Sequence, residues 1–178
     1  MKNTIIFLLL ASSGMVFSQG KYLTKNGTIN FEASVPSFEE VKAKNESVTA
    51  ILNTENGEMA ALALIKGFRF KVALMEEHFN ENYIESSKFP KATFKGTLES
   101  FEFDNLQSEY LLNGSITLHG KTKDISTKMK LEEKGDQLVV SGSFVLRPED
   151  FDIEIPKIVS NKIAEEVNVN VNFLLKRK

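Results

Sequence analysis

The sequence of 178 residues has no cysteine, no tryptophan and only two histidines. Without cysteine, the fold has no disulfide, no thiolate metal site and no thiol nucleophile. His78 and His119 lie far apart in the chain, and neither belongs to a zinc-binding pattern. The spacing of Glu76, Glu77, Glu81 and Glu85 around a helix favours a solvated face over paired catalytic acids. The sequence also lacks phosphate-binding and dinucleotide-binding glycine motifs, the G-x-S-x-G elbow and the calcium-binding loop. We therefore predict no catalytic residues, no metal site and no cofactor.

The chain also lacks an excess of charge of either sign. It has 22 Lys and Arg residues against 24 Asp and Glu residues, which gives a formal net charge of −2. The lysines between Lys121 and Lys130 alternate with other residues, as on the outer face of a strand, but no aromatic residue accompanies them. Sheets that bind single-stranded nucleic acid use exposed aromatic side chains. We predict that nucleic acid is not a partner.

One hydrophobic run stands at the N-terminus. Lys2 precedes an apolar stretch from Ile5 to Leu10, which continues more weakly and ends on the small residue Ser18. Small residues interrupt the run, and it is shorter than the ~20 apolar residues that a membrane-spanning helix needs. This pattern is typical of a secretory signal peptide. We expect residues 1–18 to be cleaved, the mature protein to be periplasmic or secreted, and no stable membrane span to remain.

Residues 19–178 show alternation of apolar and polar side chains with period two, which is the pattern of half-buried strands. The Asn56-Gly57 pair predicts a tight turn between two strands. The stretch from Met59 to Phe70 is more uniformly apolar and predicts a strand buried on both faces, with Gly67 as a bulge or a point of close approach. Clear alternation occurs in residues 28–33, 92–98, 112–118, 125–131, 138–146 and 167–173.

This spacing predicts an all-β fold, a single antiparallel barrel of about eight strands with one or two short helices. A barrel of about eight strands is either filled by its own side chains or holds one small ligand. The first predicted helix spans Met75 to Tyr83, and Pro90 prevents its continuation. The second spans Pro156 to Glu166, where isoleucine and valine recur at helical spacing. We find no repeat or linker that indicates a second domain.

Three sequence blocks resemble the YceI family of secreted or periplasmic proteins, which are described as polyisoprenoid-binding with a lipocalin-like barrel. The first block is FPKATFKG, with Phe89, Pro90 and Phe94. The second is LLNGSITLHGKTKDIS, and the third is GSFVLRPEDFDI, which contains Arg147 and Phe151. The order and spacing of the blocks agree with the family. The resemblance implies that residues 19–178 form a lipid-binding barrel domain, with an isoprenoid chain inside and its head group near the rim.

The residues expected to line such a barrel are those on the inward faces of the predicted strands. Burial of hydrocarbon contributes about 0.8 kcal/mol per methylene, so an apolar tube binds a long chain with few polar contacts. For each residue, ordinary core packing is the alternative. Phe79 and Tyr83 are expected to close one end. The other candidates are Phe31, Phe68, Phe70, Phe94, Leu98, Ile116, Leu118, Met129, Val140, Phe144 and Phe173.

Arg147 is the strongest polar candidate, because a guanidinium group suits a phosphate or carbonyl head group. Its alternative role is an ion pair with Glu149, Asp150 or Asp152, which are close in sequence. The leading hypothesis is a carrier of a long-chain isoprenoid such as a quinone or polyprenol derivative. Two alternatives stay open: an interaction or stress-related protein with a filled barrel, and a lipid-modifying enzyme that uses a histidine and a carboxylate. The sequence also leaves open whether the protein forms a homodimer.

Overall fold

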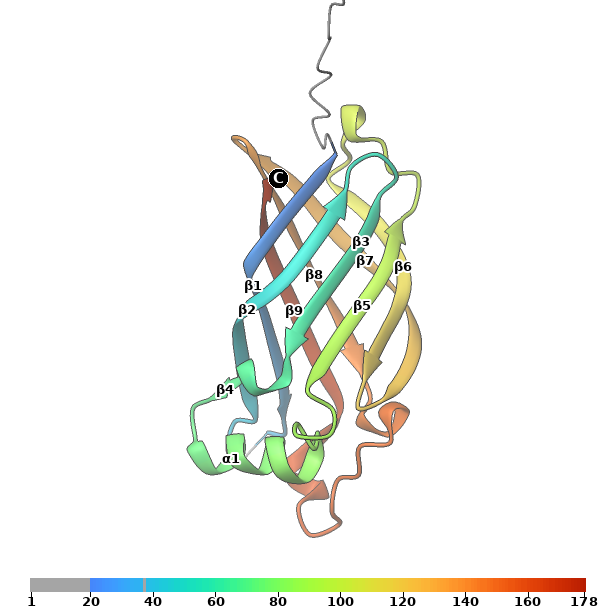
Figure 1. Ribbon diagram of the computed structural model, residues 1–178. Coiled ribbons are helices and arrows are strands. Elements are labelled where there is room, and N and C mark those ends of the chain that lie inside the picture. The colour runs from blue at the N-terminus through green and yellow to red at the C-terminus, as the bar shows by residue number, and fades with distance from the viewer. Residues whose placement is uncertain (1–19, 37) are drawn as a thin grey trace, which may run out of the picture.

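The computed structural model describes residues 20–36 and 38–178 (Figure 1). The expected signal peptide, residues 1–18, lies outside the described residues. The described part of the chain consists mainly of antiparallel strands. Their bounds are β1 Lys21–Ser34, β2 Lys42–Asn53, β3 Glu58–Leu64, β4 Arg69–Phe70, β5 Lys91–Leu98, β6 Glu109–Leu118, β7 Lys121–Lys134, β8 Gln137–Leu146 and β9 Ile163–Arg177.

Among these strands, eight close into a barrel in the order β1-β9-β8-β7-β6-β5-β3-β2, and β2 pairs with β1 to complete the ring. The two-residue strand β4 pairs with the first part of β2, beside the end of β3. Closure leaves the barrel without a free sheet edge along most of its length. The predicted all-β, lipocalin-like barrel is confirmed.

Tight turns form three of the connections between neighbouring strands of the barrel, β2–β3, β6–β7 and β7–β8. The turn from β6 to β7 consists of His119 and Gly120, which both have positive φ values, of 50° and 75°. This is the backbone that a two-residue hairpin requires, and glycine adopts it without a steric penalty. Gly57 and Gly135 provide the positive φ values in the β2–β3 and β7–β8 turns. The Asn56-Gly57 pair predicted the first of these turns, between β2 and β3.

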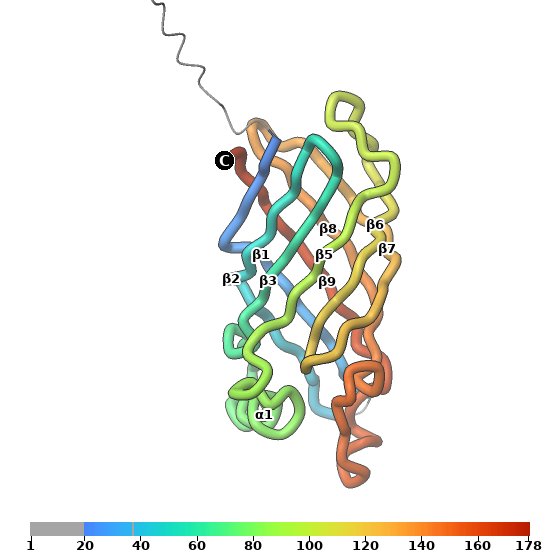
Figure 2. The backbone as a smooth tube through the Cα atoms, turned by 45° about the vertical axis from the view of Figure 1, so that its right-hand side comes forward, coloured from blue at the N-terminus to red at the C-terminus, as the bar shows by residue number. Residues whose placement is uncertain are grey.

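A short helical segment covers one end of the barrel, which we call the α1 end (Figure 2). It comprises α1, Ala73–His78, followed directly by the π-helix η2, Phe79–Tyr83. The predicted helix from Met75 to Tyr83 is therefore confirmed, although it ends well before Pro90. Four short 3-10 helices complete the described elements: η1 Ile65–Gly67, η3 Phe103–Asn105, η4 Pro148–Phe151 and η5 Ser160–Lys162.

The predicted continuous strand from Met59 to Phe70 is interrupted in the structure. β3 ends at Leu64, and η1 turns the chain before β4. The buried side chain of Asn45 explains the break, because its amide nitrogen donates a hydrogen bond of 3.0 Å to the carbonyl oxygen of Leu64. Gly67 packs directly against this amide, and a Cβ at Gly67 would lie 2.6 Å from the Asn45 nitrogen. The predicted close approach at Gly67 is correct, but it turns the chain rather than bulging a strand.

The predicted second helix, from Pro156 to Glu166, is wrong. Only η5 within it is helical, and β9 already begins at Ile163. Ile158, which was expected on the apolar face of this helix, is 85% exposed. Ile163 pairs with Ser34 of β1. β-branched residues have modest helix propensity, so the ladder hydrogen bonds of β9 outweigh it.

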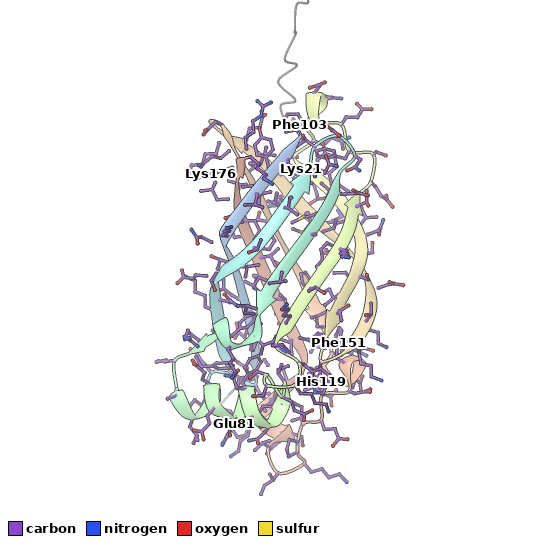
Figure 3. The ribbon with its side chains drawn as sticks, viewed as in Figure 1. Lys21, Glu81, Phe103, His119, Phe151 and Lys176 are labelled. Atoms are coloured by element: carbon purple, nitrogen blue, oxygen red, sulfur yellow. The ribbon has the colours of Figure 1, made fainter. Side chains whose placement is uncertain are left out.

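The core of the barrel is most densely packed at the end opposite α1, which we call the packed end. Figure 3 labels Lys21, Phe103 and Lys176 at the packed end, and Glu81 and His119 at the α1 end. Buried inward side chains of the packed end are Leu98, Tyr110, Leu131, Leu138, Val140 and Leu175, with Phe101, Phe103 and Leu106 packed against them. Among the described residues, no helix is both long and apolar enough to cross a membrane.

Candidate functional site

An apolar cavity of about 480 Å³ occupies the half of the barrel nearer α1. The inward faces of the strands form its wall, and α1, η2 and the β1–β2 and β8–β9 connections surround its mouth. This volume lies within the range of small-molecule binding sites. The structure brings twelve of the predicted ligand-binding residues together on its lining: Phe31, Phe68, Phe70, Phe79, Tyr83, Phe94, Ile116, Leu118, Met129, Phe144, Arg147 and Phe173.

The other two predicted residues, Leu98 and Val140, do not line the cavity. Both face into the barrel as expected, but they lie in the packed end and are only 2% and 0% exposed. Alternation identifies the face on which a side chain lies. It does not identify the position along the barrel at which the interior changes from open to filled, and these two side chains lie beyond that position.

The change from open to filled is visible along single strands. On β5, Phe94 is half-buried while Leu98 is buried. On β8, Phe144 is half-buried while Val140 is buried. All four side chains belong to the inward faces, so the partial exposure of the two phenylalanines comes from the cavity. Large apolar side chains that face an interior space without filling it are suited to contact an apolar ligand.

Four phenylalanines form a cluster beneath the helical segment. Phe79 of η2 packs against Phe31, Phe68 and Phe70, with ring centroids 5.4, 6.0 and 5.1 Å away. These are the separations of favourable tilted and edge-to-face aromatic pairs. The cluster fixes the helical segment to the strands β1 and β4 on one side of the mouth.

Two glutamates hold the helical segment at its ends. Glu76 accepts hydrogen bonds from the Arg69 guanidinium at 2.8 Å and from the backbone nitrogen of Phe70 at 3.1 Å. Glu85, just beyond η2, lies 3.1 Å from His119. From the sequence we interpreted the glutamates of this segment as a solvated face. That interpretation fits Glu77 and Glu81, which are exposed, but not Glu76 and Glu85.

Sequence reasoning missed part of the lining. Small side chains widen the wall: Ala61, Ala63 and Ala92 face the cavity from β3 and β5. Ala92 belongs to the alternating stretch 92–98, whereas Ala61 and Ala63 lie in the uniformly apolar stretch from Met59 to Phe70, where no alternation distinguishes the two faces. Ile153 and Ile155 reach the cavity from the irregular β8–β9 connection, where no periodic pattern exists to reveal them.

Arg147 lies at the mouth of the cavity, and its ion pair is with Glu166 of β9. Its Nη2 and Nε atoms donate hydrogen bonds of 2.7 and 3.2 Å to Oε1 of Glu166. The hydrogen bonds and charge of Glu166 raise the pKa of the arginine further above its usual value. The expected pairing with a neighbouring acid is therefore wrong, because Asp150 and Asp152 pair instead with Lys123 and Lys121.

The two histidines differ in their surroundings. His78 contributes to the cavity lining and is exposed at the mouth. His119 lies outside the lining, between Glu85 and the backbone oxygen of Phe151, and its ring packs edge-on against Phe89 with centroids 4.4 Å apart. An acid–base pair in the cavity would need a histidine and a carboxylate together. In this structure His78 lines the cavity, whereas the histidine that contacts a carboxylate is His119.

No group of three or more His, Asp or Glu side chains within residues 20–36 and 38–178 is arranged to hold a metal ion. Three lysines of β7 are engaged in ion pairs: Lys121 with Asp152 at 2.6 Å, Lys123 with Asp150 at 3.4 Å and Lys128 with Glu109 at 2.8 Å. These pairs neutralise much of the basic character of that strand.

The fold and the site define a closed antiparallel β-barrel with an apolar cavity that opens beside a short helical segment. A family model described as the YceI-like domain matches residues 19–175. The chain therefore belongs to the YceI-like family, as the sequence blocks indicated. A comparison with curated protein sequences finds no match.

Solved structures of similar proteins share the fold. A polyisoprenoid-binding domain from Saccharophagus degradans superposes with a TM-score of 0.75 at 14% identity, over 89% of this chain and 99% of that one. BcnA from Burkholderia cenocepacia superposes with a TM-score of 0.70 at 13% identity, over 83% and 95%. A YceI protein from Campylobacter jejuni gives 0.66 at 14% identity, over 81% and 89%. At these identities the likeness concerns the fold.

Proposed function

We propose that this protein binds a long-chain amphiphilic isoprenoid, such as a polyprenol or quinone derivative, in the barrel cavity and carries or sequesters it outside the cytoplasm. The observation that carries the proposal is the half-filled barrel, in which Phe94 and Phe144 face an open apolar space. The structural relative described as polyisoprenoid-binding supports the ligand class. The apolar run of residues 1–18 supports export.

The polar groups of the mouth fit an amphiphile whose chain enters first. The interior wall is apolar, while Arg147, Lys162, Glu39 and His78 surround the opening. A ligand with a hydrocarbon chain and a polar head can satisfy both environments, because its chain leaves water and its head stays hydrated. A fully polar metabolite would lose its hydration inside without gaining hydrogen bonds.

Two neighbouring alanines of β3 allow a matched test. Ala61 faces the cavity, whereas Ala60 occupies the opposite face of the same strand. Ala61→Phe adds a ring to the open space, and Ala60→Phe adds the same ring to the outer surface. The proteins are purified from the secretory compartment of the host and examined by native mass spectrometry, followed by organic extraction of bound lipid.

We expect one isoprenoid per barrel in the wild type and in Ala60→Phe, and loss of most of it in Ala61→Phe. The measured mass of the mature chain should correspond to a sequence that begins at Gln19. The same spectra distinguish a monomer from a homodimer. Equal lipid content in the two variants would contradict binding in the cavity. A bare wild type that also takes up neither added quinone nor added polyprenol would favour the interaction protein.

A further inference from the structure

The cavity has a defined inner end within the barrel. On β6, β7 and β9 its lining stops at Leu112, Met129 and Phe173. The next inward residues on these strands toward the packed end are Tyr110, Leu131 and Leu175, which are buried in the core cluster and do not line the cavity. Met129 and Phe173 are themselves only 1% and 2% exposed, and they are the last lining residues on their strands before the packed end. We call these two side chains the floor.

The floor side chains are seated against glycines of neighbouring strands. A Cβ at Gly142 of β8 would overlap the sulfur of Met129, and a Cβ at Gly27 of β1 would lie 2.5 Å from Cδ1 of Phe173. Each large side chain therefore occupies space that any other residue on the neighbouring strand would fill. This packing seats Met129 and Phe173 against the neighbouring strands at the inner end of the cavity.

The cavity volume converts to a chain length. A cavity of about 150 Å³ accommodates benzene, so a cavity of about 480 Å³ accommodates roughly 20 carbon atoms. We infer that, given the proposed function, the barrel encloses only about three to four isoprene units of its ligand, with Met129 and Phe173 as the residues that set this limit. The further units of a longer chain lie outside the mouth, where they remain in water and add little affinity.

The test measures affinity against chain length at a constant head group. Prenyl monophosphates of two to six isoprene units compete with a fluorescent farnesyl probe, each below its aggregation concentration. Burial of hydrocarbon predicts that each unit added inside the cavity strengthens binding by about tenfold or more. We expect the affinity to increase in this way up to three or four units. Beyond that length, each further unit should change the affinity by less than about threefold. We call the chain length at which the increase stops the break.

Two variants of the floor should shift the break, and a third variant, away from the floor, should not. Met129→Ala removes part of the floor and should shift the break toward longer chains by about one unit. Gly142→Ala displaces the end of Met129 toward the open cavity and should shift the break toward shorter chains. Leu138→Ala is the matched control, because it shortens a buried side chain of the packed end, away from the floor, and should leave the break unchanged.

Ala61→Leu keeps the test decisive if a floor variant does not fold. It adds volume to the cavity wall and should shift the break toward shorter chains. Affinity that rises steadily through six units, or a break that Ala61→Leu and Met129→Ala leave unchanged, would overturn the inference while leaving the proposed function intact. Failure of every prenyl phosphate and of the probe to bind would overturn the proposed function itself.

Discussion

His119 and Glu85 lie 34 positions apart in the chain, yet Nε2 of the imidazole is 3.1 Å from Oε2 of the carboxylate. The other ring nitrogen, Nδ1, is 2.9 Å from the backbone oxygen of Phe151. His119 occupies the β6–β7 turn, Glu85 follows the helical segment, and Phe151 ends η4. One largely buried ring therefore joins three connections that surround the α1 end of the barrel.

His119→Phe should destabilise the protein by about 2 kcal/mol, because a ring of similar shape leaves the Glu85 carboxylate and the Phe151 carbonyl without this partner. Thermal and urea unfolding followed by circular dichroism measure the change. His78→Phe is the control, since His78 is exposed, and exposed substitutions of this kind change the free energy of unfolding by less than about 0.5 kcal/mol. Equal effects of the two substitutions would show that the hydrogen bonds of His119 do not contribute.

Gly114→Ala should destabilise the barrel by about 2 kcal/mol or more. A Cβ at this position would overlap the backbone oxygen of Lys95 and lie 2.6 Å from Cα of Gly96, and neither atom can move without separating β5 from β6. Gly142→Ala should cost less, because its closest conflict is with the end of the flexible Met129 side chain. Urea unfolding of both variants gives the comparison, and the reverse order would contradict this account of the two contacts.

Arg147→Met should weaken binding of a prenyl phosphate by roughly fivefold relative to the prenol of the same length, because an exposed charge pair makes only a small contribution. Glu166→Gln should have the opposite effect, since it releases the guanidinium from its hydrogen bonds of 2.7 and 3.2 Å. Calorimetric titration at low and high salt measures both, and salt should reduce the difference. The melting temperature should change little. A loss of melting temperature with unchanged selectivity would assign Arg147 a purely structural role.

Asp152 should titrate below its ordinary range in the folded protein. The hydrogen bond and charge of Lys121, 2.6 Å away, lower the pKa of the carboxyl group from its usual value of 3.8. Because the folded state favours the carboxylate, this pair stabilises the fold above the ordinary pKa and loses its contribution as the pH falls through the lower, folded pKa. Carbon-detected NMR titration of the side chain reports the midpoint. In Lys121→Met the midpoint should rise; an unchanged midpoint would exclude Lys121 as the cause.

The positions of the strands and of the first helix could be predicted because they depend on local patterns. Alternation in residues 92–98 and 112–118 reflects side chains that point to opposite faces of one strand, which no distant contact can alter without moving the whole segment. The turns at Gly57, Gly120 and Gly135 were predictable for a related reason, since few residues other than glycine adopt their positive φ values readily.

The errors concern segments whose conformation depends on a partner distant in sequence. Asn45 ends β3 from 19 positions away. Ile163 joins a ladder with Ser34 instead of continuing a helix. Arg147 forms its ion pair with Glu166 of β9 rather than with the acidic residues beside it in sequence. In each case a contact with a residue distant in sequence outweighed a local preference, either for helix or for a neighbouring ion pair, that is energetically weak.

The sequence by itself determined the all-β class, the inward faces of the strands, the helical segment and the YceI-like family, because these follow from the order of side chains along the chain. Only the tertiary structure decided how far the barrel is filled. Leu98 and Phe94 share an inward face, yet one is buried in the packed end and the other borders the cavity. The difference arises from the side chains that the other strands contribute at each level: Met129 and Phe173 are buried at the inner end of the cavity, whereas small residues such as Ala61 and Ala92 line its wall. The sum of those volumes around the barrel determines whether space remains for a ligand.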